Sequence, residues 1–152
     1  MIRNYFYLIV GLVCLLSAVT HTLNGLETAI ASLNHSTMDA HNKVVFTYVW
    51  HIIGVENVVF GVALLIMAFH KERTGGKYIA WFIIAILVLR WLTILFFSLL
   101  NNVEEIATLI PETIVIWIVI VLLWFGIKIN NKQLTQNHKK TAQSKNNIAS
   151  HS

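Results

Sequence analysis

Four long apolar runs dominate this chain, and each is long enough to cross a lipid bilayer as a helix. A membrane-crossing helix needs about 20 mostly apolar residues, because the hydrocarbon layer is about 30 Å thick and each helical residue rises 1.5 Å. Only 12% of the residues are charged, whereas a soluble domain averages about 25%. We therefore predict an all-α, polytopic membrane protein, an antiparallel four-transmembrane-helix bundle in residues 1–129, with spans at about 4–23, 44–69, 77–100 and 106–129.

The start of the fourth span is open between two positions. If this helix begins at Pro111, the proline occupies the first helical position and Glu112 lies in the first turn, where the helix dipole favours a carboxylate. If it begins near Ile106, Pro111 lies inside the helix and kinks it. We prefer the first arrangement.

Basic residues in the flanks predict the orientation, because cytoplasmic loops carry an excess of Lys and Arg. The side facing away from the termini holds Lys43 together with acidic residues. The side of the termini holds Arg3, Lys71, Arg73, Lys77, Lys128, Lys132, Lys139, Lys140 and Lys145. We therefore expect both termini in the cytoplasm.

After residue 129 the composition changes to Asn, Gln, Lys, Ser and His. Such a segment has little apolar surface to bury against the entropy cost of ordering. The sequence therefore predicts a disordered, basic cytoplasmic tail over 130–152.

Small residues predict where the first two spans meet, because helices in lipid associate by close backbone approach. Gly11 and Ala18 share one face of the first span, and Gly54 and Gly61 lie on a similar stripe of the second. Each seam carries a histidine near the same end, His21 and His51. We expect the two imidazoles to converge.

Arg90 lies about midway through the third span. An arginine there costs at least about 2.5–3.5 kcal/mol unless it has a partner. Glu56 and Glu112 lie within about one turn of its expected depth. Because Glu56 projects away from the seam of His51, it faces either the third helix or a second copy of the protein.

Ionisable groups inside a span are functional-site hypotheses. We therefore expect a ligand-binding cluster of His21, His51, Arg90, Glu56 and Glu112. His21 and His51 could ligate zinc, copper or a haem iron. They could also donate hydrogen bonds to a quinone-like ligand whose ring packs on Trp91 or Trp117. These choices stay open, and the sequence names no cofactor.

The function expected is binding of a small ligand in a redox-associated role. The alternative is a non-enzymatic accessory, partner-subunit or immunity-type membrane protein whose buried charges are structural. No G-x-S-x-G, H-E-x-x-H or P-loop motif is present, so whether the chain is an enzyme stays open.

The expected partners are the lipid bilayer and either a second copy or a membrane partner subunit, with no nucleic acid. In size and four-span arrangement, the first 130 residues resemble the DoxX-like group of small bacterial membrane proteins. This resemblance implies a multi-pass protein of a bacterial cytoplasmic membrane and carries over no site residue.

Overall fold

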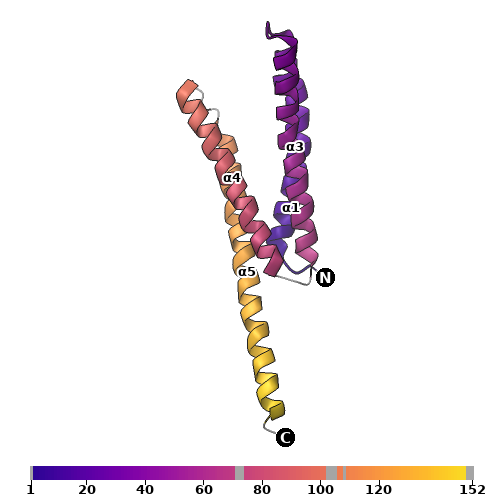
Figure 1. Cartoon of the computed structure of the whole chain (residues 1–152), viewed down its shortest axis with the longest axis vertical. Helices are drawn as coiled ribbons and strands as arrows, with labels where there is room; N and C mark the ends of the chain where they lie inside the picture. Colours follow the sequence, from indigo (N-terminus) through magenta and orange to yellow (C-terminus); the bar gives the residue numbers. More distant parts are fainter. Residues whose placement is uncertain (1, 71–73, 102–105, 108, 150–152) are drawn as a thin grey trace. The chain divides into compact units, whose positions relative to one another are not determined.

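A computed structural model describes residues 2–70, 74–101, 106, 107 and 109–149, and the regular structure within them is helical (Figure 1). The elements are α1 (Tyr5–Asn24), the π-helical turn η1 (Gly25–Ala29), α2 (Ile30–His35), α3 (Ala40–Phe69), α4 (Thr74–Asn101) and α5 (Ile110–Ala149). Four stretches are long and apolar enough to cross a membrane: Tyr5–His35, Ala40–Phe69, Gly75–Leu100 and Ile110–Asn131. The expectation of an all-helical chain with four candidate spans is confirmed.

The chain divides into two compact units. One consists of Leu8–Ile66, and the other combines Met1–Tyr7 with Met67–Ser152. Each unit therefore contains one long pair of helices, and each is described by itself.

In the unit Leu8–Ile66, α1 and α3 pack against each other in antiparallel orientation, and glycines lie at their contact. A Cβ placed on Gly61 would lie 2.7 Å from Cγ of Leu15 and 2.9 Å from the carbonyl oxygen of Gly11. A Cβ on Gly11 would lie 3.0 Å from Cγ of Leu65. The absence of side chains at these two glycines lets the helix backbones approach closely, as the small-residue seams predict.

In the other unit, α4 and α5 lie side by side (Figure 1). Their buried side chains recur at steps of three and four residues, so each helix buries one face. On α4 these residues are Ala80, Ile83, Ile84 and Leu87, and on α5 they are Ile116, Val119, Leu123 and Ile127.

The start of α5 lies close to the predicted helix start, whereas its end lies well beyond the predicted end of the fourth span. The helix begins at Ile110 and places Glu112 in its first turn. This start is one residue before the preferred start at Pro111, so the proline is the second helical residue and not the first. At its other end the helix continues to Ala149. The structure is therefore helical over most of the segment 130–152, for which the composition predicts disorder. Residues 131–149 contain neither glycine nor proline, so nothing in the backbone interrupts the hydrogen bonds between successive turns.

Parts of several sequence expectations lie outside the described residues. These are the loop charges at 71–73 and at 102–105 and the final residues 150–152.

Candidate functional site

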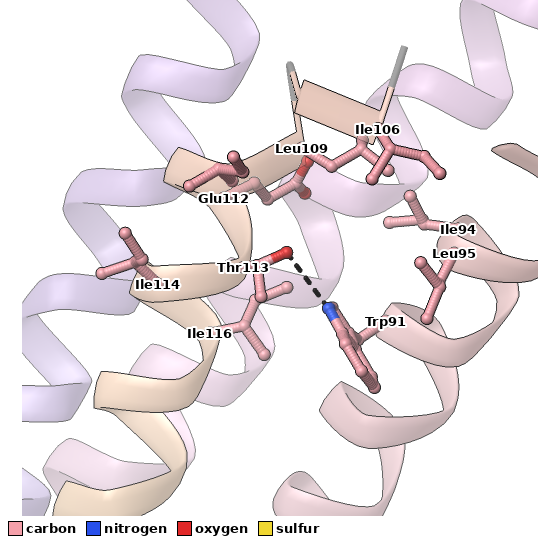
Figure 2. A pocket seen from close by; sticks show the side chains of 10 residues that line it. Trp91, Ile94, Leu95, Ile106, Leu109, Glu112, Thr113, Ile114 and Ile116 are labelled. Atoms are coloured by element: carbon pink, nitrogen blue, oxygen red, sulfur yellow. Dashed lines mark hydrogen bonds between the residues drawn. The ribbon is translucent and has the colours of Figure 1, made fainter. Parts of the chain in front are cut away.

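A partly enclosed cavity of about 250 Å³ lies between the C-terminal half of α4 and the first turns of α5 (Figure 2). Its walls are mostly apolar, and its polar side chains are Glu112, Thr113 and the indole of Trp91. The described residues that line it are Trp91, Ile94, Leu95, Ile106, Leu109, Ile110, Glu112, Thr113, Ile114 and Ile116.

Helical spacing brings these side chains to one place. Trp91, Ile94 and Leu95 follow at three- and four-residue steps and therefore share a face of α4. Residues 106, 107 and 109 form a 3₁₀ turn just before α5. The side chains of Ile106 and Leu109 from this turn join the lining.

The polar groups of the cavity are oriented by a hydrogen bond between the two helices. Nε1 of Trp91 donates to Oγ1 of Thr113 over 3.1 Å (Figure 2). An indole N–H can only donate, so Thr113 uses an oxygen lone pair here. Among the residues that the structure describes, its own proton has no acceptor and can donate to a ligand. The Trp91 ring also meets the edge of Trp117, with ring centroids 5.7 Å apart.

Glu112 adds a carboxylate to the cavity lining from the first turn of α5. The positive end of the helix dipole stabilises a negative charge at this position. The described part of the cavity therefore offers one hydroxyl donor and one carboxylate acceptor within apolar walls.

No protein-family model, curated protein or solved structure matches this chain. The DoxX-like resemblance accordingly rests on size and the number of spans alone, and the function has to be argued from the geometry.

His21 lies in a packing contact between α1 and α3. Its ring stacks on Trp50 with centroids 4.5 Å apart and planes 8° apart. His21 Nε2 is 3.2 Å from the carbonyl oxygen of Trp50, and Trp50 Nε1 donates to the carbonyl oxygen of His21 over 3.2 Å. Because a carbonyl only accepts, Nε2 of His21 carries a proton and is the donor.

Gly25, in η1, makes room for this contact. A Cβ on Gly25 would overlap the indole nitrogen of Trp50, so the indole rests directly on the helix backbone. His51 lines a separate groove on the same pair of helices, to which His21 does not contribute.

The other predicted site residues divide between the two units. Glu112 lines the cavity, whereas Arg90, although it precedes Trp91 on α4, is not among the lining residues. Glu56, on α3, and Arg90 are each partly buried and each engaged in an interaction. Their pairing with one another stays a prediction.

The loop between α2 and α3 carries an aspartate and is flanked by histidines. Within the described part of the chain, no three His, Cys, Asp or Glu side chains lie close enough together to hold a metal ion. His35 and His41 are exposed. Asp39 precedes α3, and its carboxylate accepts the backbone N–H of Asn42 over 3.0 Å.

Sequence reasoning did not single out Thr113, although a polar residue in the first turn of α5 is the available signal. It also missed a buried polar network at the start of α1. Asn4 donates to the carbonyl of Gly126 over 2.9 Å and to Oδ1 of Asn130 over 3.2 Å. Its own Oδ1 accepts the backbone N–H of Tyr7 over 3.2 Å, which makes Asn4 the cap of α1. The signal for this network was an asparagine directly before an apolar run.

Proposed function

We propose that this chain is a small multi-pass membrane protein that binds a quinone-like molecule in the cavity between α4 and α5. The observation that carries the proposal is the pairing of apolar walls with the Thr113 hydroxyl and the Glu112 carboxylate. An apolar cavity of about 150 Å³ accommodates benzene. A cavity of about 250 Å³ therefore has room for a substituted ring.

The two polar groups suit both redox forms of such a ligand. The carbonyl oxygen of a quinone accepts the free proton of Thr113, and the hydroxyl of the corresponding quinol donates to Glu112. Among the residues described, the cavity lining contains no imidazole, and imidazole is the most common protein ligand of metal ions. A quinone-like ligand therefore fits this cavity better than a metal or a haem.

The proposed setting is a bacterial cytoplasmic membrane with both termini in the cytoplasm. This orientation follows from the distribution of basic residues between the loops. It places the cavity in the outer half of the bilayer, because α4 ends and α5 begins on the side away from the termini.

A binding titration tests the proposal. A short-chain benzoquinone is added to the purified protein in mild detergent, and quenching of tryptophan fluorescence is followed. Saturable quenching is expected, since the ligand would lie against Trp91. Thr113→Val should raise Kd by about fivefold, which corresponds to the loss of one neutral hydrogen bond of about 1 kcal/mol.

Thr93→Val is the matched control. Thr93 is an exposed threonine of α4 that bonds the carbonyl of Leu89 in its own helix and does not line the cavity. Quenching that rises linearly without saturation indicates partition into the micelle and contradicts the proposal. Equal Kd values for the two threonine variants contradict it as well. Either result would favour an accessory role.

A further inference from the structure

A second hollow runs along the α1–α3 pair, within the unit Leu8–Ile66. It is an open groove of about 480 Å³, and one of its residues, Val55, is 63% exposed. Its lining consists of Leu15, Ala18, Val19, Thr22, Leu23, His51, Gly54, Val55 and Val58.

The groove is polar at one end and apolar at the other. Because α1 and α3 are antiparallel, Thr22 and His51 lie at the same end, where α1 passes into η1. Leu15 and Val58 lie at the opposite end. The two ends are separated by about two helical turns, or about 10 Å.

His51 is the donor at the polar end. Thr22 donates its proton to the carbonyl of Ala18 over 2.9 Å, so its hydroxyl offers only lone pairs to a ligand. His51 forms no hydrogen bond with any residue that the structure describes. A ring N–H of His51 is therefore free to donate to a group in the groove.

The length of helix from His51 to the end of α3 and the aromatic residues beside His51 favour a membrane boundary near the polar end of the groove, about seven residues further along α3 than the expected start of this span at residue 44. The helical stretch from His51 to Phe69, the end of α3, is about 27 Å long at 1.5 Å per residue. This length nearly matches the hydrocarbon thickness of about 30 Å. Tyr48 and Trp50 lie beside His51 in sequence, and such residues are enriched at the membrane–water interface.

We propose that the α1–α3 groove binds one phospholipid from the adjacent leaflet. Its phosphate accepts a hydrogen bond from His51, and one acyl chain lies along Val55 and Val58 toward the middle of the bilayer. The groove runs in the same direction as a bound lipid would, because its polar end faces the lipid headgroup and its apolar end faces the acyl chain.

Native mass spectrometry tests this proposal independently of the quinone titration. The protein is released from mild detergent containing phosphatidylglycerol, and the fraction that retains one lipid is measured. His51→Leu, which removes the donor, and Val58→Phe, which fills the groove, should each lower that fraction by about fivefold. Diacylglycerol with the same chains should be retained less than phosphatidylglycerol by a similar factor.

Two variants outside the groove are the matched controls. His41→Leu removes an exposed histidine, and Val59→Phe enlarges a neighbouring exposed valine that is 58% exposed. Both should retain lipid as the wild type does, and circular dichroism should show that all four variants are equally helical. Equal retention in His51→Leu and His41→Leu overturns the proposal, as does equal retention of the two lipids. A protein dimer that Val58→Phe dissociates would identify a second copy as the occupant and would also overturn it.

Discussion

Gly126 on α5 lies directly beneath the aromatic ring of Tyr7, and replacing it by alanine tests how tightly this unit is packed. A Cβ at Gly126 would lie 2.5 Å from Cε1 and 2.7 Å from Cδ1 of Tyr7. Carbon atoms in contact normally stand about 3.5–4.0 Å apart. The ring must therefore move by about 1 Å.

Tyr7 has little freedom to make this movement. Its side chain is fully buried, its hydroxyl donates to the carbonyl of Gly76 over 3.5 Å, and it accepts from Nδ2 of Asn130 over 3.4 Å. Overpacking of this kind costs about 1–3 kcal/mol, and loss of these two long hydrogen bonds adds about 0.5 kcal/mol each. Alanine gains about 0.5–1 kcal/mol over glycine in a helix. We therefore expect Gly126→Ala to lower the free energy of unfolding by about 1–3 kcal/mol.

Gly75→Ala is the matched control, because a Cβ at Gly75 meets no atom within 4 Å. It should leave stability unchanged or raise it by up to about 1 kcal/mol. The assay is reversible unfolding in mixed micelles of mild detergent and dodecyl sulfate, followed by circular dichroism. In a Tyr7→Ala background, Gly126→Ala should no longer destabilise the protein, since the obstructing ring is gone. Equal stability of the Gly126→Ala and Gly75→Ala proteins would refute the packing argument.

Two further predictions concern the unit Leu8–Ile66. His21→Ala should lower the free energy of unfolding by about 1–3 kcal/mol. The variant loses a hydrogen bond worth about 1 kcal/mol and a ring stack worth about 0.5–1.5 kcal/mol. An unchanged unfolding midpoint together with an unchanged near-ultraviolet circular dichroism of Trp50 would contradict this prediction. The second prediction rests on Asp39, where the backbone N–H of Asn42 holds the pKa of the carboxyl below its usual value of 3.8. A lowered folded-state pKa means that ionised Asp39 stabilises the fold at neutral pH and that this contribution is lost as the pH falls through the folded-state pKa. Asp39→Asn keeps a helix cap at this position but does not titrate. When the pH is lowered from neutral to about 3, the wild type should therefore lose more stability than Asp39→Asn does. Parallel pH profiles of the two proteins would show that Asp39 does not act as the cap.

The candidate cavity could be anticipated from the sequence only in part. Glu112 was predicted as a site residue because it lies near the expected depth of Arg90, and its place in the first turn of a helix was anticipated from the proline before it. Trp91 was considered as a ring-packing residue. Their meeting through Thr113 depends on the register between α4 and α5, which the sequence pattern does not specify.

The buried polar network illustrates the same limit. The asparagine before the first apolar run is a helix-cap signal that the sequence analysis did not use, and Asn130 looked like the first residue of a polar tail. Its side chain is only 5% exposed. Its burial results from contacts with Asn4 and Tyr7, which are more than 120 positions away in the chain.

By itself, the sequence determined that this chain forms helices long enough to cross a membrane and which glycines bring α1 and α3 together. These properties depend on hydropathy and on residue periodicity, which are local. The tertiary structure alone decided that His21 stacks on Trp50, that Thr113 bonds Trp91, and that hollows remain beside α3 and α4. The physical reason is that apolar helices present similar surfaces in every direction. Which side chains meet is therefore set by the relative rotation and register of each pair, and these follow from packing over the whole length of the helices.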